Sequence, residues 1–538
     1  MATLDPTRDR TTADGLARML RDGRITRRGF LARAAGLVGG LSAAEGLLAR
    51  VVGAQTTAKT DLVVAQSGDI SKLDPHLATG VWAIPITFNL YDLLTIRRPD
   101  GKLYPGLATE WRLLNPTTWQ FRLRPGVKFH NGEPVTSADV KFSIDRTYDP
   151  NVKVSSVRTT FPTVDRVETP DALTVVFHTK HPDALMPARL AFYGGHIMPK
   201  KYFEAVGAEA FNQKPVGCGP LKFVEWVKDE RVVFDAYRDY WDGKIDAERV
   251  VFRPIPEAAP RIAALLKGEV DLITKVPPDH VDRIAKHPTT KVGRALYAGL
   301  YVLAVNSKRP PLDNPKVKQA LSLAIDREAI IKELWHGQGI VPSGPIAQGD
   351  THFDSALPPL KSDAALARQR LKESGYKGEE IVFQSTVGLV SNDKPMAEAI
   401  VAMWRDIGVT ARVEIIEASV RAQMAREKSF KGIFWSDPVS SLGDPDGMMW
   451  RLLGPGGFLD YWRHPRFDEL GRAAQSSVDE KVRGDAYREM TQIFLEHLPW
   501  IPVIQPIESY GLQRYVDWRP HPTQLIELRR FNFKFART

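Results

Sequence analysis

One continuous stretch, residues 108–146, limits most tightly what this chain can fold into. Residues 119–123 alternate apolar and polar side chains, which is the period-two pattern of a strand with one buried face. Pro125-Gly126 then predicts a turn, residues 127–129 a second short strand, and Asn131-Gly132 another tight turn. The first half of the stretch therefore predicts strand, turn, strand and turn in quick succession.

The second half of the stretch predicts a helix with a defined start and end. Thr136 and Asp139 have the spacing of a capping box, in which each residue satisfies a free backbone N–H at the helix start. Val140 and Ile144 lie on one face of this helix. Asp149-Pro150 marks its end, because the residue before a proline avoids the helical conformation.

The same residues also carry a resemblance. From Trp119 to Ser143 the chain reads WQFRLRPGVKFHNGEPVTSADVKFS, which closely resembles the signature of family 5 extracytoplasmic solute-binding proteins, the dipeptide- and oligopeptide-binding subunits of ABC importers. The chain departs at one small position, where Ser137 replaces the family's alanine. In that family the segment lies in an accessory domain. The resemblance implies an α/β, two-lobed periplasmic binding-protein fold, class II-like, with an additional accessory domain.

The length of the chain agrees with several domains. A chain of 538 residues is too long for one hydrophobic core and is expected to form two to four domains. Strands that alternate with helices over both lobes favour mixed, largely parallel sheets. With the resemblance, we expect a leader at 1–54; lobe I at 55–94, 217–300 and 505–538; the accessory domain at 95–216; and lobe II at 301–504.

The N-terminus resembles an export signal. Residues 26–31 (TRRGFL) resemble the twin-arginine (Tat) motif, and a Gly/Ala-rich apolar run follows to Leu48. The alternative is a transmembrane anchor, which Arg33 and Glu45 within the run disfavour because buried charges are costly in a bilayer. Small residues end at Ala54, so we expect cleavage near Ala54 and a periplasmic mature protein.

Composition and motifs exclude several other classes. A net charge of +9 over so long a chain is weak evidence for a nucleic-acid partner, and we expect none. Cys218 is the only cysteine; it allows no intramolecular disulfide, and its Gly-Cys-Gly-Pro setting indicates a tight turn more than a reactive thiol. The chain has no phosphate-binding loop, no metalloprotease or serine-hydrolase motif, and no zinc-ligand spacing. We therefore expect no catalytic residue, no cofactor and no metal.

Two segments are predicted to line a ligand cleft. In peptide-binding relatives, the loop that corresponds to residues 79–83 reaches into the cleft and its backbone can pair with ligand. Trp82 is accordingly a candidate wall or stacking residue, and the alternative is a core tryptophan. Gly80 and Val81 precede it in the same loop.

The second segment is GIFWSDPVSSLGDPDG, residues 432–447, which resembles the relatives' cleft strand G-W-x-x-D-x-x-D-P. In those relatives the strand backbone pairs with the ligand, and the first Asp neutralises the peptide's α-amino group. Trp435 fits the Trp and Asp444-Pro445 the Asp-Pro, but the spacing between them is longer. Ser441 then stands at the amino-binding position, unless the extra residues form a bulge and Asp437 replaces it. The predicted ligand-binding residues are Gly80, Val81, Trp82, Phe434, Trp435, Ser436, Asp437, Ser441 and Asp444.

The carboxylates Asp444 and Asp446 have rival interpretations. A calcium loop fails, because Leu442 and Leu453 would occupy its first and last ligand positions. Nothing in the sequence supports a general acid–base pair. Asp-Pro-Asp-Gly is itself a strong turn sequence, and we predict that role for Asp446.

The function that the resemblance implies is capture of a small solute between two lobes and its delivery to an ABC permease, by a monomer that is not an enzyme. Family members take peptides, opines, nickel complexes, glutathione or oligosaccharides. The alternatives are a secreted hydrolase of peptides or glycans, which would need a nucleophile and base or two cleft carboxylates, and a binding module that serves a chemoreceptor.

Overall fold

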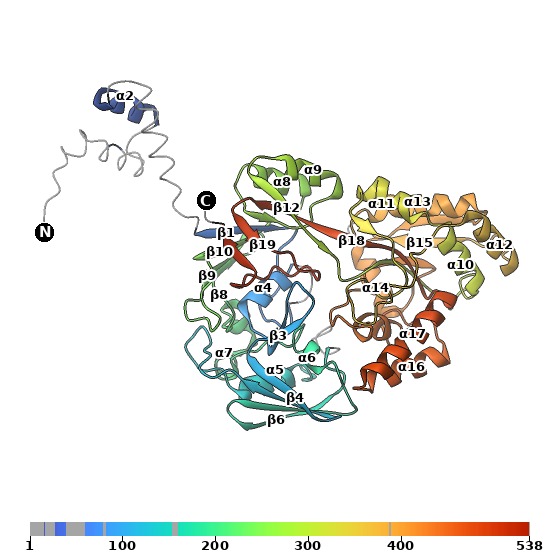
Figure 1. Cartoon of the computed structure of the whole chain (residues 1–538), viewed down its shortest axis with the longest axis horizontal. Coiled ribbons are helices and arrows are strands. Elements are labelled where there is room, and N and C mark those ends of the chain that lie inside the picture. Colours follow the sequence, from blue (N-terminus) through green and yellow to red (C-terminus); the bar gives the residue numbers. More distant parts are fainter. Residues whose placement is uncertain are drawn as a thin grey trace. The chain divides into compact units, whose positions relative to one another are not determined.

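The computed structural model describes residues 16, 27–38, 60–78, 82–152, 160–386 and 389–536 (Figure 1). The chain separates into two units, Met1–Asp61 with Arg537–Thr538, and Leu62–Ala536. In the first unit the structure describes helix α2 (Arg27–Val38). None of the helices in the described part of the chain is both long and apolar enough to cross a lipid bilayer.

One mixed sheet of twelve strands runs through the second unit. Its order is β16 (Ala411–Ile415), β15 (Ile381–Ser385), β17 (Ile433–Ser436), β13 (Tyr301–Val305), β18 (Trp500–Gln513), β11 (Leu272–Ile273), β1 (Asp61–Gln66), β10 (Arg249–Pro254), β9 (Arg231–Ala236) and β8 (Leu221–Val227). Two further strands, β12 (Thr290–Leu296) and β14 (Gly339–Ile340), pair with β18.

Strand β18 joins the two ends of this sheet. Its first residues pair with β13, and its last residues pair with β11 and β12 (Figure 1). All of these pairs are antiparallel, whereas β1 pairs parallel with β11, and β15 pairs parallel with β16 and β17. The prediction of mixed sheets is confirmed, but the prediction that they are largely parallel is wrong, because β18 runs antiparallel to its partners and β9 runs antiparallel to both β8 and β10.

Residues 108–146 form one helix and part of a smaller antiparallel sheet. The sheet has the order β4 (Ala108–Asn115), β5 (Thr118–Leu123), β7 (Thr174–Thr179), β6 (Val164–Asp171). Helix α5 (Ser137–Arg146) starts with the predicted capping box, in which Asp139 Oδ2 accepts from Thr136 N at 2.9 Å. The predicted second strand at 127–129 is only an isolated bridge between Lys128 and Pro134, because the Asn131-Gly132 turn follows too closely for a ladder.

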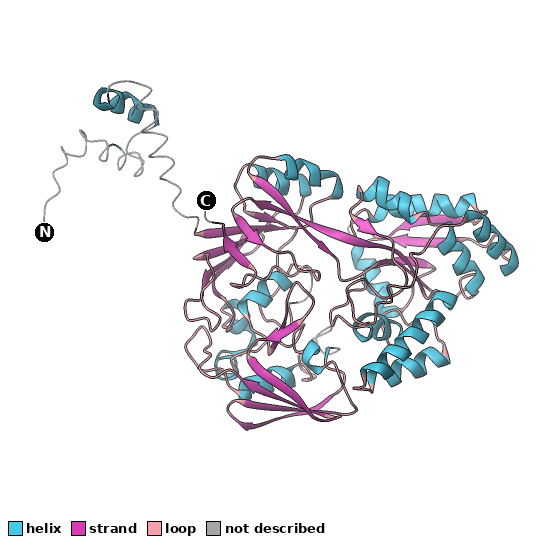
Figure 2. Ribbon diagram, viewed as in Figure 1, coloured by secondary structure: helices cyan, strands magenta, loops and turns pink. Residues whose placement is uncertain are grey.

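Helices flank both sheets (Figure 2). Those before the long helix α13 are α4 (Ile84–Leu90), α6 (Met186–Arg189), α7 (Lys200–Gln213), α8 (Ala258–Leu266), η3 (Pro278–His280), α9 (Val281–Lys286), α10 (Pro315–Ala324), α11 (Arg327–Trp335) and α12 (Ala364–Ser374). The others are α13 (Asp393–Asp406), α14 (Ala418–Glu427), η4 (Asp446–Trp450), α15 (Arg451–Leu453), α16 (Pro465–Gln475) and α17 (Glu480–His497). Two short ladders, β2 (Thr95–Arg97) with β3 (Leu103–Pro105) and β19 (Val516–Trp518) with β20 (Phe533–Phe535), complete the elements.

Apolar side chains gather into separate cores. The largest lies within residues 297–504 and buries Trp404, Trp435 and Trp500. A second core lies within residues 94–218; it contains Phe121 and also Cys218, which is buried and not presented to solvent. A third combines residues 62–91 with residues 198–272 and 510–533. Burial of this kind is the main favourable contribution to folding, so each core can hold its part of the chain together.

Candidate functional site

A cavity of ≈ 600 Å³ lies where segments of the separate cores meet. One wall comes from the 94–218 core and its flanks, with Arg189, Phe192 and Tyr193. The opposite wall comes from the residues that follow β17 and from α14 and α15. Tyr297, Thr523 and Gln524 close it beside β18. The volume falls within the range of about 300–1,000 Å³ typical of small-molecule sites.

Asp437 contributes the carboxylate of this cavity. It is the first residue after β17, whose backbone is paired with β13 on one edge and with β15 on the other. Beyond Asp437 the chain pairs again, where Pro438 O accepts from Leu300 N at 3.1 Å. The Asp437 side chain is therefore fixed at a defined point of the wall. Burial raises the pKa of its carboxyl to about 6, against the charges of Arg421 and Lys275, which favour the ionised form.

Two arginines face the same space. Arg421 on α14 donates from Nη2 to Trp435 O at 3.3 Å, and Arg451 on α15 donates from Nε to Gly447 O at 2.8 Å. The Arg451 side chain stays exposed on the cavity wall, although the surrounding protein excludes enough water to lower its pKa. Burial also lowers the pKa of Arg421, while Asp437 raises it. Guanidinium groups keep their charge through such shifts, so both remain cationic donors.

The cavity walls are otherwise aromatic and apolar. Burial raises the pKa values of Tyr193 and Tyr297, so both phenols stay protonated and can donate hydrogen bonds. Phe458 is 37% exposed on the rim, and Leu442 and Leu452 add apolar surface. Such a wall can hold the apolar part of a solute, while the charged groups fix its orientation.

A small side pocket adjoins the main cavity at Gln524, which lines both. Trp82 stands in this pocket, 43% exposed, with Nε1 donating to Ser67 Oγ at 3.0 Å. Trp82 is thus a wall residue and not a core residue; Gly80 and Val81 lie outside the described residues. Gln524 Nε2 donates to Glu508 Oε1 at 3.1 Å, and Lys275 Nζ lies 3.9 Å from the same oxygen, so the charges of this pocket balance each other.

The structure separates the residues predicted from 432–447 into two groups. The side chains of Ser436, Asp437 and Ser441 line the cavity. Phe434 and Trp435 point into the core instead, where Phe434 stacks on Phe430 and Trp435 Nε1 donates to Asp393 O at 3.1 Å.

Asp444 lies apart from the cavity lining and is engaged by the protein itself. Its carboxylate accepts from Arg483 Nη2 at 2.7 Å and from Thr351 Oγ1 at 3.1 Å. It also accepts from Asp446 N at 2.9 Å, as in a turn that begins with Asp. Of the two carboxylates among the predicted ligand-binding residues, Asp437 and Asp444, only Asp437 stands in the cavity wall.

Sequence reasoning missed Arg421, Arg451, Arg189, Tyr193 and Tyr297. None belongs to the motifs that suggested a cleft, and no local pattern distinguishes them from ordinary helix and loop residues. Their common position follows only from the packing of the cores against one another.

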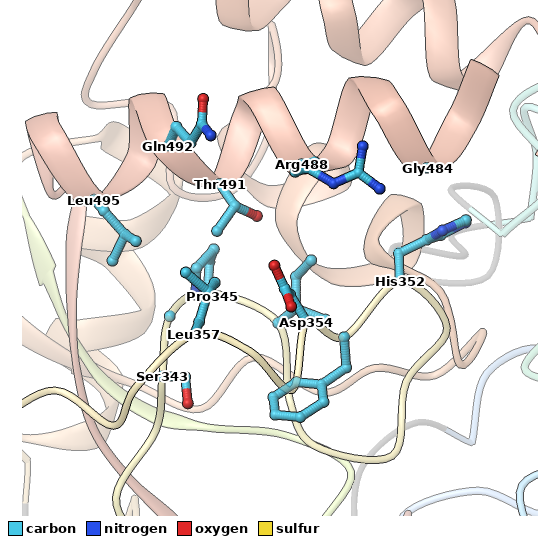
Figure 3. A pocket seen from close by; sticks show the side chains of 13 residues that line it. Ser343, Pro345, His352, Asp354, Leu357, Gly484, Arg488, Thr491, Gln492 and Leu495 are labelled. Carbon is cyan, nitrogen blue, oxygen red and sulfur yellow. The ribbon is translucent and has the colours of Figure 1, made fainter. Parts of the chain in front are cut away.

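A second cavity, of ≈ 280 Å³, lies between α17 and the loop at 343–357 (Figure 3). Two of its charged groups are paired with neighbouring side chains: Arg488 Nη1 lies 2.8 Å from Asp485 Oδ1, and His352 Nε2 lies 3.2 Å from Glu480 Oε1. A third, Asp354, accepts from the backbone N–H of Ala356 at 2.9 Å. The lining residues of this second cavity all lie within the part of the chain that forms the 297–504 core. We therefore place the candidate site in the larger cavity. In neither cavity, nor elsewhere in the described residues, do three or more His, Cys, Asp or Glu side chains form a group that could hold a metal ion.

A cavity lined by residues of separate cores, with one long strand linking them, is typical of a protein that binds a small solute. Residues 102–460 match the family described as bacterial extracellular solute-binding proteins, family 5 (middle), and the chain belongs to this family. It is thus an extracytoplasmic solute-binding protein of an ABC transporter, a class that binds solutes and does not transform them. The predictions of family, fold class and functional class are confirmed.

Relatives of known role agree with this assignment. The chain is 30% identical over 448 residues to heme-binding protein A of Haemophilus influenzae, covering 77% of this chain and 81% of that protein. It is 27% identical over 488 residues to the dipeptide-binding protein of Escherichia coli, covering 84% and 90%. The structure of a dipeptide-binding protein from a Pseudoalteromonas species, in complex with Met-Leu, superposes with a TM-score of 0.78 at 25% identity, over 88% of this chain and 100% of that one.

Proposed function

We propose that this protein captures a peptide-like solute in the ≈ 600 Å³ cavity, with the solute's ammonium group on Asp437. The observation that carries the proposal is the position of Asp437, a carboxylate on the cavity wall that forms no ion pair with any described residue. An ammonium against such a carboxylate makes a charge-assisted hydrogen bond, which is about twice as strong as a neutral one. The dipeptide-binding relatives support a solute of this kind.

Solute capture also requires that the cavity open and close. We propose that the core within residues 297–504 belongs to lobe II (301–504), that the core within 94–218 belongs to the accessory domain (95–216), and that the remaining segments form lobe I (55–94, 217–300 and 505–538). Strand β18, which pairs with elements of both ends of the large sheet, is then the connection about which the lobes move. Closure with solute requires higher affinity in the closed form than in the open one.

Titration calorimetry with di- and tripeptides tests the proposal. The wild-type protein should bind at least one dipeptide with a stoichiometry of one, and mass spectrometry should recover that peptide intact. Asp437→Asn should lose affinity steeply while its melting temperature stays close to that of the wild type. The matched control Asp282→Asn removes an exposed carboxylate outside the cavity and should bind normally. An unchanged dissociation constant for Asp437→Asn would refute the assignment of the ammonium to this residue.

The route to the periplasm and the partner there are also proposals. Residues 26–31 act as a twin-arginine export signal, cleavage occurs near Ala54, and the mature monomer delivers its solute to the permease subunits of an ABC importer. Residues 39–59, where cleavage would fall, lie outside the described residues. Replacing both Arg27 and Arg28 by Lys should retain the precursor in the cytoplasm, which fractionation and immunoblotting measure; normal export of this variant would exclude the pathway.

A further inference from the structure

The charged groups on the cavity wall suggest a narrower solute class. Among the described residues, four charged side chains line the cavity: Asp437, Arg189, Arg421 and Arg451. Arg189 is already neutralised, because its Nε lies 2.9 Å from Asp183 Oδ2 and its Nη2 lies 2.8 Å from Asp446 Oδ2. One carboxylate and two guanidinium groups remain to meet a solute.

Arg421 and Arg451 differ from the buried arginines of this protein in how few partners they have. Arg261 and Arg327 also form no ion pair with any described residue, but each donates several hydrogen bonds to backbone carbonyls. Four buried arginines each hold a carboxylate within 3 Å, namely Arg146 with Asp74, Arg189 with Asp446, Arg483 with Asp444 and Arg529 with Asp92. Arg421 and Arg451 each make a single hydrogen bond, to a backbone carbonyl, and neither forms an ion pair with any described residue. Both residues line the cavity, and among the described residues neither has a further hydrogen-bond acceptor.

The described acidic residues near Arg421 and Arg451 form no ion pair with either arginine. Asp446 attracts Arg451, but its two carboxylate oxygens accept from Arg189 Nη2 at 2.8 Å and from Gln475 Nε2 at 3.3 Å. Asp437 attracts Arg421 without an ion pair. Lys275 and Glu508, in the adjoining pocket, lie 3.9 Å apart and offset each other.

We infer that the cavity is built for a solute that carries one ammonium and two carboxylates, as a dipeptide with an acidic side chain does. The inference rests on the proposed function and narrows it. The ammonium lies on Asp437, the main-chain carboxylate on Arg421, and the second carboxylate on Arg451. Guanidinium groups bind carboxylates through two parallel N–H donors, which fixes both position and angle. Tyr193 lines the same cavity, and its protonated phenol can donate a further hydrogen bond to the solute.

The test compares Ala-Glu with Ala-Gln, two dipeptides of nearly equal shape that differ by one carboxylate. Titration calorimetry at pH 7.5 should give the wild-type protein an affinity for Ala-Glu about tenfold or more above that for Ala-Gln, as one charge-assisted contact provides. In Arg451→Gln the preference should fall to about threefold or less, with the affinity for Ala-Gln unchanged. The matched control Arg488→Gln, an exposed arginine of the other cavity, should keep the wild-type preference.

Failure of the inference and failure of the proposed function give different results in these titrations. Equal affinities of the wild type for both dipeptides would overturn the inference and leave the proposed function intact. A preference that survives in Arg451→Gln would overturn the assignment of the second carboxylate to this residue. If neither these nor other di- and tripeptides bind, the proposed function itself fails. A melting temperature of Arg451→Gln close to that of the wild type confirms that the variant is folded.

Discussion

Arg189 and Asp446 form an ion pair of 2.8 Å between Nη2 and Oδ2, with each side chain only 3% exposed. The two residues lie 257 positions apart in the sequence and come from different parts of the fold: Arg189 ends α6, and Asp446 begins η4. A second contact between residues distant in the sequence is a hydrogen bond from Arg97 Nη2 to the backbone carbonyl of Leu442. Both contacts lie beside the ≈ 600 Å³ cavity, so they hold its two walls together.

The first prediction concerns this ion pair. Asp446→Asn weakens the charge-assisted hydrogen bond to Arg189, at a cost of about 1.5–3 kcal/mol. If the pair exists only when the lobes are closed, the cost appears in solute binding, and the dissociation constant should rise about tenfold to a hundredfold. Small-angle scattering should show a larger radius of gyration for the ligand-free variant than for the ligand-free wild type.

The opposite result would also be informative. A loss in the free energy of unfolding, measured by urea titration, with an unchanged dissociation constant would mean that the pair belongs to the permanent fold. Arg189 would then stabilise the packing of α6 and would not contribute to closure of the lobes.

A second prediction is the pH dependence of binding. The pKa of Asp437 is raised to about 6 in the empty cavity, mainly by burial. An ammonium bound to the carboxylate stabilises the ionised form and lowers this pKa, so binding near pH 6 releases a proton. Affinity should be constant above about pH 7 and fall on acidification through pH 6, by up to about tenfold per pH unit.

Calorimetry at pH values from 5 to 8 checks this prediction. Asp437→Asn provides the control, because its affinity should be low and independent of pH over the same range. A wild-type affinity that rises on acidification would have the wrong sign for an ammonium on Asp437.

The sequence predicted those parts of the fold that local contacts determine. The capping box of α5 involves Thr136 and Asp139, three residues apart, and it forms as expected. Helix α12 is bounded by local contacts in the same way: Asp363 Oδ1 accepts from Leu366 N at its start, and Gly375 ends it with a φ of 74°, a conformation that glycine adopts without strain. Such features need no information from the rest of the chain.

The site was only partly predictable from the sequence, because it depends on contacts between residues that lie far apart in the chain. The segment 432–447 was identified through a motif, and both Asp437 and Asp444 were predicted to bind ligand, but the motif could not show which of them faces the cavity. Which carboxylate faces the cavity depends on Arg483 in α17. This residue, distant in the sequence from the motif, pairs with Asp444. Arg421 and Arg451 join Asp437 only through the packing of α14 and α15, which leaves no local signature.

A third prediction separates the two carboxylates by their roles. Asp444→Ala leaves Arg483 buried without its partner, and the loss of one member of a buried pair costs about 3–5 kcal/mol. The free energy of unfolding should fall by this amount, as urea titration measures. Because Asp444 lies outside the cavity lining, the dissociation constant of the folded variant should change by less than about threefold. A large loss of affinity with normal stability would instead assign the ligand contact to Asp444.

The last prediction concerns the support beneath Arg451. Gly471 in α16 packs directly against the ring of Trp450, the residue before Arg451, and a Cβ at this position would overlap the ring. Glycine to alanine normally stabilises a helix by up to about 1 kcal/mol. Here the overlap must displace Trp450, and overpacking of this kind costs about 1–3 kcal/mol. Gly471→Ala should therefore lower the free energy of unfolding, which urea titration measures.

Gly484→Ala is the matched control, because a Cβ there would meet only the His352 ring, at 3.2 Å. It should be neutral or slightly stabilising. Displacement of Trp450 also moves the α15 backbone that carries Arg451, so Gly471→Ala should weaken the preference for Ala-Glu over Ala-Gln, whereas Gly484→Ala should preserve it. A stable Gly471→Ala variant with full discrimination would show that α15 is positioned independently of α16, against the packing described above.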